Sequence, residues 1–296
     1  MRVADQQLYG LMSGNLSRLR RDMLGTQTEI ATGKRINQPS DDPIGFGQSL
    51  SMKSSLSAIE QRLRNIQFGE TRVNAADAAL GEVSTVLSRI KQLAVQARSD
   101  TSEPIGRTAI ATEIRQLQQQ LVTLGNTQVS GQYIFAGTNT DQPAFVAGPG
   151  DSVTYQGNDE VQAVLVGDGE TVQVALPGNQ VFTGPDVDLF ASIKNLISGI
   201  ETNDGDAIEA GIGNLETSIA QSAAAHGHIG ALQNRLSGSA QSLEAFRDNV
   251  RTALSETEDA DLARTLTEFS QQQVAFQAVA ETTSRIFEST LLNFLR

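Results

Sequence analysis

The sequence predicts a fold that is mainly α with a β insertion. The expected architecture is an elongated antiparallel helical bundle or coiled coil built from both chain ends, with a small central β domain. Apolar residues recur at helical spacing along both ends of the chain. The segment between them is rich in glycine, proline and strand-favouring residues. The chain is therefore expected to fold back like a hairpin, so that its first and last helices meet.

Composition restricts the function. The 296 residues include no cysteine, so no disulfide framework or thiolate metal site is expected. The net charge of −12 argues against nucleic acid or an anionic membrane surface as the main partner. Most of the excess lies in residues 131–210, which hold one lysine and twelve acidic residues. A solvated surface is the simpler explanation of this charge, and a cation site is the alternative.

Neither a membrane span nor a cleavable secretory signal is predicted. A span requires an apolar run of about 18 residues, and no run reaches that length. The first ten residues, MRVADQQLYG, lack a basic stretch followed by an apolar one. A protein of this kind would leave the cell by a route that reads another signal.

A first helix is expected over residues 5–32. Its stripe follows spacings of three and four residues and consists of Tyr9, Met12, Leu16, Leu19, Met23 and Ile30. Gly10, Gly14 and Gly25 interrupt it, each at a cost of about 1 kcal/mol relative to alanine. This helix should therefore need a partner to form.

A loop with breakers at Gly33, Asn37 and Pro39 should follow the first helix. Asp42 can cap the next helix, and Pro43 suits its first turn. That helix is expected over residues 43–99, with a coiled-coil seam that slips near residues 73–80. Pro104 signals a restart, and a third helix should reach about residue 128.

Residues 131–185 have the pattern of a small inserted β unit. The expected strands are Gln132–Phe135, Ser152–Tyr155, Val161–Val166, Thr171–Leu176 and Val181–Phe182. The dipeptide Asp168-Gly169 lies between two of these runs and indicates a hairpin turn.

Helical spacing returns at Asp186 and continues, apart from a break at residues 203–205, to an acidic interruption at residues 256–261 that could act as a hinge. The last helix carries a stripe of Leu262, Leu266, Phe269, Gln273, Phe276, Ala280, Thr283, Phe287 and Phe294, broadened near the end by Leu291, Leu292 and Leu295. This stripe has two interpretations. It belongs either to an ordinary docked C-terminal helix or to a surface that is buried only against neighbouring subunits.

The sequence contains no set of residues typical of an active site, a cofactor site or a metal site. His226 and His228 are the only histidines, and they lie on different faces of a predicted helix. Asn203, Asp204 and Asp206 lack the later glycine and glutamate of a calcium loop. An enzyme is therefore the class of protein least expected. A basic cluster of Arg18, Arg20 and Arg21 is either a solvated helix face or part of an intersubunit salt bridge.

Three parts are expected. Residues 1–42 and 256–296 should form terminal helices of an inner assembly domain. Residues 43–130 and 186–255 should form a helical bundle, and residues 131–185 should form the inserted β domain.

Several segments resemble the flagellin superfamily. IATGKRINQPSDDP at residues 30–43 is similar to its N-terminal signature, here Gly33, Lys34, Arg35, Ile36, Asn37, Ser40, Asp41, Asp42 and Pro43. TLLNFLR at residues 290–296 resembles its C-terminal tail. QYIFAGTNTDQPAF at 132–145, SVTYQG at 152–157 and LPGNQVF at 176–182 resemble members found at the hook–filament junction, with Tyr133, Phe135 and Gly137 most characteristic. Asn179-Gln180 stand where those members usually have an acidic pair.

The resemblance implies a non-enzymatic structural adapter of the bacterial flagellum. Such a subunit forms a ring with its own copies and joins hook-associated protein 1 to the flagellin filament. It is exported unfolded to the cell exterior through the flagellar type III apparatus, without a cleaved signal peptide and with help from an export chaperone. The expected assembly interface comprises Tyr9, Met12, Leu16, Leu19, Met23, Leu262, Leu266, Phe269, Phe276, Phe287, Leu291 and Phe294. A filament flagellin, and a coiled-coil signalling or binding module, are the alternatives.

Overall fold

The computed structural model describes residues 2–99, 104–167, 169–184 and 187–294, and for residues 2–6, 8, 9 and 286–294 it describes only the backbone. The helices are α1 (Arg2–Thr32), α2 (Pro43–Ala97), α3 (Pro104–Gly125), α4 (Gly178–Phe182), α5 (Leu189–Thr202), α6 (Gly205–Glu258) and α7 (Leu262–Phe294). The strands are β1 (Gln128–Val129), β2 (Gln132–Tyr133), β3 (Phe145–Ala147), β4 (Val153–Tyr155), β5 (Ala163–Leu165) and β6 (Thr171–Gln173). The mainly helical fold with a small β insertion is therefore confirmed.

The chain divides into two compact units. The terminal unit comprises Met1–Ala58 and Phe246–Arg296, and the central unit comprises Ile59–Ala245. The three-part division expected from the sequence uses other boundaries and stays a prediction.

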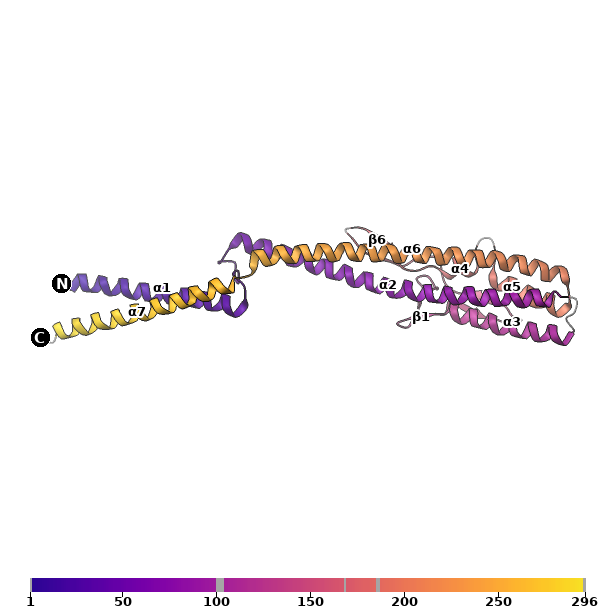
Figure 1. The fold of residues 1–296 in the computed structure, drawn as a ribbon, viewed down its shortest axis with the longest axis horizontal. Coiled ribbons are helices and arrows are strands. Elements are labelled where there is room, and N and C mark those ends of the chain that lie inside the picture. The colour runs from indigo at the N-terminus through magenta and orange to yellow at the C-terminus, as the bar shows by residue number, and fades with distance from the viewer. Residues whose placement is uncertain (1, 100–103, 168, 185–186, 295–296) are drawn as a thin grey trace. The chain divides into compact units, whose positions relative to one another are not determined.

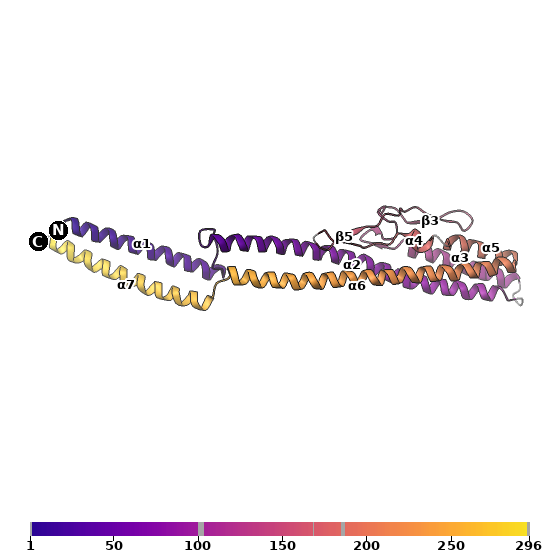
Figure 2. The ribbon, with the colours of Figure 1, turned by 90° about the horizontal axis from the view of Figure 1, so that it is seen from above.

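In the terminal unit, α1 and α7 lie side by side and antiparallel (Figures 1 and 2). The hydroxyl of Thr26 on α1 donates a hydrogen bond to the side-chain oxygen of Gln272 on α7, at 3.0 Å. This contact fixes the register, because it places the last quarter of α1 level with the first third of α7. The first and last helices therefore meet, as the sequence predicts.

The central unit has a continuous apolar core. On α2 the buried positions repeat every seven residues from Ile59 to Ala94, and a second series runs every seven residues from Gly69 to Ala97. The prediction that the seam slips near residues 73–80 is wrong, because the seven-residue repeat of buried positions continues through these residues. It arose because Gly69 and the small Ala76 occupy seam positions where a larger apolar residue is usual.

α6 runs antiparallel to α2 in the central unit, and polar contacts cross between the two helices. Asp77 on α2 contacts His226 on α6 at 2.9 Å, and Lys91 on α2 pairs with Glu216 on α6 at 2.8 Å. α3 and α5 contact each other along the same unit (Figure 2). These helices build the bundle from which the β segments project.

The strands form three separate antiparallel hairpins, β1–β2, β3–β4 and β5–β6. Four of the five expected runs contain a strand, but Val181–Phe182 was wrong, because these residues end the short helix α4. Sequence reasoning also missed β1 and β3. The hairpin expected around Asp168-Gly169 is confirmed by the β5–β6 pairing, although Asp168 itself lies outside the described residues.

Phe145 is the centre of an aromatic cluster that closes the β segments onto the bundle. Its ring centroid lies 5.0 Å from that of Phe182 and 5.2 Å from those of Tyr155 and Phe190. Gly178 lies against the same ring, because a Cβ built there would come within 2.7 Å of Phe145 and 3.0 Å of a backbone carbonyl. The position therefore has room only for glycine.

Gly178→Ala should consequently lower the free energy of unfolding by about 1–3 kcal/mol, because the added methyl group overpacks the aromatic cluster. Gly213→Ala is the matched control, since Gly213 lies in α6 with nothing near its Cβ position. That change should stabilise by up to about 1 kcal/mol through helix propensity. Urea denaturation of both variants measures the difference. Equal behaviour of the two would contradict the packing argument.

Candidate functional site

The terminal unit exposes an unusual amount of apolar surface. Of the thirteen large apolar side chains that are exposed in the described part of the chain, eight belong to this unit: Leu11, Leu24, Ile44, Leu50, Phe246, Leu262, Leu266 and Val274. The terminal unit holds fewer residues than the central unit, so the excess is not a matter of size. Concentrated exposed apolar surface marks an interaction surface.

Helices α1 and α7 bury almost nothing against each other. Among their described side chains, only the polar Thr26 and Thr265 are buried. The expected interface residues divide into two groups. Met12, Leu16, Leu19, Met23, Phe269 and Phe276 are half-buried, whereas Leu262 and Leu266 are 47% and 53% exposed. The side chains of Tyr9, Phe287, Leu291 and Phe294 lie outside the described residues.

The half-buried phenylalanines of α7 lie on its α1-facing side. Phe269 and Phe276 flank Gln272 at spacings of three and four residues, which places all three on one helix face. Gln272 is the residue that bonds to Thr26 of α1. Contact with α1 alone covers only one side of each phenylalanine ring, and the other side can still pack against a further partner.

A backbone clasp joins the loop after α1 to the connection between α6 and α7. The amide of Arg35 donates to the carbonyl of Glu258 at 2.7 Å, and the amide of Ala260 donates to the carbonyl of Gly33 at 2.9 Å. The guanidinium of Arg35 also donates to the carbonyl of Thr257 at 2.9 Å. Gly33 has a φ of +69°, a left-handed conformation that ends α1 and that glycine adopts without strain.

Glu258 anchors this clasp from the inside. The residue is 3% exposed, and its carboxylate lies 2.7 Å from Nζ of Lys34 and 2.6 Å from Nζ of Lys53. Burial by itself raises the pKa of Glu258, but the hydrogen bonds and charges of the two lysines outweigh it and hold the pKa below its ordinary value of 4.5. The carboxylate thus ties the signature loop and the first turns of α2 to the end of α6.

The remaining signature residues shape the loop. Asp41 accepts hydrogen bonds from the amides of Asn37 and Gln38, both at 2.9 Å, and the first of these is the main cause of its lowered pKa. Asp42 caps α2 by accepting from the amide of Gly45 at 2.9 Å, as the sequence predicts, and this bond lowers its pKa. Ile36 is the one apolar side chain buried among the described residues of the terminal unit.

The second characteristic block has a packing role in the central unit. The carbonyl of Phe135 accepts hydrogen bonds from the amide of Gly178 at 2.7 Å and from the hydroxyl of Tyr155 at 3.0 Å. Burial raises the pKa of Tyr155 to about 12, so its hydroxyl stays a donor. Gly137 has a φ of +72° and lies against the backbone of Asn158. The three segments that resemble junction proteins therefore converge on one bonded cluster.

Asn179, the first residue of the Asn179-Gln180 pair, has a polar partner in the structure. Asn179 donates from its side-chain amide to the carboxylate of Asp159, at 2.5 Å. An acidic residue at position 179 would instead face a second carboxylate. The substitution is thus matched to this chain's own partner.

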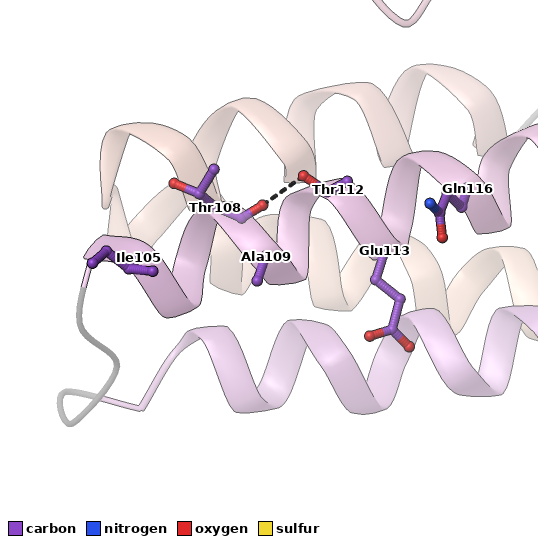
Figure 3. A pocket seen from close by; sticks show the side chains of 6 residues that line it. All are labelled: Ile105, Thr108, Ala109, Thr112, Glu113 and Gln116. Carbon is purple, nitrogen blue, oxygen red and sulfur yellow. Dashed lines mark hydrogen bonds between the residues drawn. The ribbon is translucent and has the colours of Figure 1, made fainter.

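A surface hollow of the central unit does not have the groups of an active site. It lies along α3, has a volume of about 750 Å³ and is lined by Ile105, Thr108, Ala109, Thr112, Glu113 and Gln116 (Figure 3). Its single titratable group, Glu113, is paired with Arg89 at 2.7 Å. The hydroxyl of Thr112 donates to the carbonyl of Thr108 within the helix. No nucleophile with an adjacent base lies in this hollow.

Other chemistry-bearing groups are also accounted for. Across the described residues, no cluster of three or more acidic residues or histidines has the arrangement of a metal site. His226 contacts Asp77 between α6 and α2. Arg18, Arg20 and Arg21 are all exposed. None of the helices described is both long enough and apolar enough to span a bilayer.

Sequence reasoning missed Glu258 and Lys53, which complete the clasp. Glu258 lies within the acidic interruption at residues 256–261, where α6 ends and α7 begins after the cap at Asp261. Nothing in the sequence distinguishes Glu258 from the other acidic residues of this run, so its burial could not be read from the run alone. The signal that could have found it is the pairing of that run with the basic Lys34-Arg35 of the opposite terminal segment.

The family models identify the class of protein. The N-terminal helical region of bacterial flagellin matches residues 3–140, and its C-terminal helical region matches residues 212–295. Together these matches cover most of the chain. The chain therefore belongs to the bacterial flagellin family.

Within this family, the chain is similar to proteins named flagellar hook-associated protein 3. The Salmonella typhimurium protein is 27% identical over 68% of this chain and 65% of its own length. The Escherichia coli protein is 25% identical, and the match covers 94% of both chains. A flagellin from Halalkalibacterium halodurans is 26% identical over 84% of this chain and 82% of its own. These relatives are structural components of the flagellum.

Solved structures share the fold. A structure described as a hook-associated protein of Vibrio parahaemolyticus matches with a TM-score of 0.69 and 22% identity, covering 74% of this chain and all of that one. A structure of the Xanthomonas campestris protein FlgL matches with a TM-score of 0.63 and 17% identity, over 69% of this chain and 99% of that one.

The clasp should weaken in acid. Because the pKa of folded Glu258 is lowered, its stabilisation is present above pH 4.5 and is lost as the pH falls through the folded pKa. Glu258→Gln should lower stability by about 1–3 kcal/mol at neutral pH and reduce the loss of stability below pH 4.5.

Limited proteolysis of the loop at residues 33–42, carried out from pH 3 to pH 7, measures this effect. Asp41, Asp42 and Glu29 titrate in both proteins, so the difference between the two pH curves isolates Glu258. Parallel curves for the two proteins would show that the carboxylate does not hold the clasp.

Proposed function

We propose that this chain is a non-enzymatic structural adapter of the bacterial flagellum, located outside the cell, which joins hook-associated protein 1 to the flagellin filament. Copies of the chain form a ring, and the terminal helices fold and assemble in one coupled step. The observation that carries the proposal is the near absence of buried side chains between α1 and α7. Two long helices that expose their apolar residues in this way need further partners.

The energy available for assembly is of the right size. Burying one leucine or phenylalanine contributes roughly 1.5–3 kcal/mol. The exposed and half-buried residues of α7 alone, Leu262, Leu266, Phe269, Val274 and Phe276, could together contribute on the order of 10 kcal/mol before the cost of ordering the helix. This supports assembly that is stable only when several neighbours cover the helices.

The adapter role is favoured over a filament role by the bonded cluster around Phe135. It unites the three segments that resemble junction proteins, with the Gly178 amide and the Tyr155 hydroxyl on one carbonyl. The printed names of the relatives include hook-associated protein 3, which supports the same assignment. On this proposal, export occurs through the flagellar type III apparatus with a dedicated chaperone and without a cleaved signal.

A filament flagellin is the second candidate, because flagellins match with nearly the same identity as the hook-associated proteins. Deletion of the gene separates the two. Loss of a junction subunit leaves bare hooks and flagellin secreted into the medium. Loss of a flagellin leaves completed junctions without filaments.

A coiled-coil signalling or binding module is the candidate from another class. It would not need apolar terminal helices that stay uncovered, and its isolated chain would be uniformly ordered. No groups in the described part of the chain point to a ligand for such a module, whereas the terminal unit of this chain leaves eight large apolar side chains exposed.

The isolated chain should therefore be ordered unequally. Backbone amides of residues 2–42 and 256–294 should exchange with solvent at least about a hundredfold faster than those of α2 and α6 in the central unit, because little burial opposes their opening. Hydrogen–deuterium exchange of the monomer measures this. Uniform protection from one end to the other would remove the coupled-folding mechanism.

Phe269→Asp/Phe276→Asp should abolish filament attachment, because two carboxylates would occupy a surface that must be desolvated in the assembly. Phe68→Asp is the control. Phe68 is 45% exposed in the central unit, and a carboxylate there would lie near the guanidinium of Arg72. Electron microscopy of the hooks scores the fraction that carry filaments. Normal attachment by the double variant would exclude the proposed interface.

A further inference from the structure

A charged cleft lies within the terminal unit, where the end of α1 approaches the start of α7. Its volume is about 360 Å³, and its charged lining consists of Glu29, Arg35, Asp259, Asp261, Arg264 and Glu268. The four carboxylates outnumber the two guanidinium groups. Arg35 donates to the carbonyl of Thr257, and Arg264 pairs with Glu268 at 2.8 Å, so Glu29, Asp259 and Asp261 are left without an arginine of their own in the cleft. The cleft therefore keeps an excess of negative charge.

Glu29 is the unsatisfied member of this lining. It is half-buried, and its carboxylate forms no hydrogen bond or ion pair with the residues that the structure describes. Burial raises the pKa of Glu29, and the negative charges of Glu268 and Asp41 raise it further, against the opposing effect of Arg35 and Arg264. A cation placed beside Glu29 would relieve this repulsion.

The opposite face of the same helix pair carries an exposed arginine, Arg20, which has apolar neighbours and no ion pair with the residues that the structure describes. Arg20 precedes Glu29 by nine residues, which places their side chains about 180° apart around α1. On α7, Leu266 and Glu268 are two residues apart, or about 160° around the axis. Arg20 is exposed, and Leu24, one turn further along α1, is 54% exposed.

We propose that Arg20 of one copy binds in the charged cleft of a neighbouring copy of this chain, where it pairs with Glu29 beside the Arg264–Glu268 ion pair. The inference rests on the proposed function, because it requires copies of the chain side by side. A second copy is the occupant that the charges favour, because the cleft has excess carboxylates and the opposite face of the same unit offers an exposed arginine. The planar guanidinium suits bidentate pairing with a carboxylate.

This contact joins two different faces of the same chain, so it repeats from copy to copy. A repeating contact of this type generates a ring or a helix, which is the symmetry a ring of adapters needs. Arg20 and Glu29 are nine residues apart on α1. Neighbouring copies would therefore be shifted along the helix axis by on the order of 13 Å.

Disulfide trapping tests the contact, because the natural chain has no cysteine. In Arg20→Cys/Glu268→Cys the two positions cannot pair within one chain. The Thr26–Gln272 bond places Glu268 level with about residue 30, roughly 15 Å from Arg20 along the axis. A disulfide requires Cα atoms within about 7 Å.

Flagella assembled from this double variant should give dimers and higher oligomers on non-reducing gels after mild oxidation. Arg18→Cys/Glu268→Cys is the control. Arg18 is also exposed, but it lies about 160° around α1 from Arg20, so it should give no cross-link. Assembled flagella without cross-linked Arg20→Cys/Glu268→Cys, or equal cross-linking of the control, would overturn the proposal.

Charge reversal gives a second test that does not depend on cysteine geometry. Arg20→Glu should lower the fraction of hooks with filaments about tenfold, and Arg20→Glu/Glu29→Arg should restore it. A single variant with normal attachment, or a double variant without recovery, contradicts the contact. If Phe269→Asp/Phe276→Asp blocks attachment while Arg20→Glu does not, this contact is wrong and the adapter function stands. Normal attachment by the phenylalanine variant refutes the adapter interface itself.

Discussion

Two helices in contact can bury only one side of each, and this constraint governs the whole terminal unit. Along α1 and α7 the contact covers Thr26 and Thr265 completely and the larger apolar residues only in part. A stable helix bundle needs more neighbours than a single partner supplies, since most helical stability comes from packing of an apolar face. The central unit meets this need internally, because α2, α3, α5, α6 and the β segments enclose one continuous core. The described residues of α1 and α7 do not meet it within the chain, and the proposed function has neighbouring subunits supply the missing contacts.

Along the chain, the clasp lies between the sparsely buried helices α1 and α7 and the segments that lead into the well-packed central unit. Glu258 lies where α6 ends, and it holds Lys34 of the signature loop and Lys53 of α2 at hydrogen-bond distance. A buried carboxylate is costly unless it is paired, so the loop and the helix ends must come together or the charge is left unsatisfied. Together with the backbone bonds at Gly33 and Arg35, the pairing of Glu258 fixes where α1 ends and where α7 begins. The signature loop therefore forms a junction within the chain, joined by contacts between residues more than two hundred positions apart.

The sequence was sufficient for features whose cause is local. The cap at Asp42, the break after Glu258 and the hairpin around Gly169 follow from capping and turn chemistry, and the structure contains all three.

Two features were predicted wrongly. Val181–Phe182 was assigned to a strand because its residues favour one, but these residues lie in helix α4, which places Phe182 against Phe145 in the aromatic cluster. The α2 seam was interrupted in the sequence only because Gly69 and Ala76 are small. Both errors have the same origin: packing against distant segments overrode the local pattern. The pairing of Glu258 with two lysines was missed because one partner lies 224 positions away, and only the opposite charges of the two terminal segments indicate it in the sequence.

The concentration of exposed apolar residues in the terminal unit is related to the same constraint. A chain that must stay soluble before assembly cannot leave long apolar stripes on all its helices, and this one confines most of its exposed apolar residues to the terminal unit. The three glycines of α1, none of which has a neighbour within 4 Å of its Cβ position, weaken that helix without serving any packing need inside the chain. On the proposed function, a weak helix with an uncovered apolar stripe becomes fully ordered only when neighbouring subunits cover that stripe. The central unit thus solves its packing problem within the chain, whereas on the proposed function the terminal unit solves the same problem by packing against neighbouring subunits.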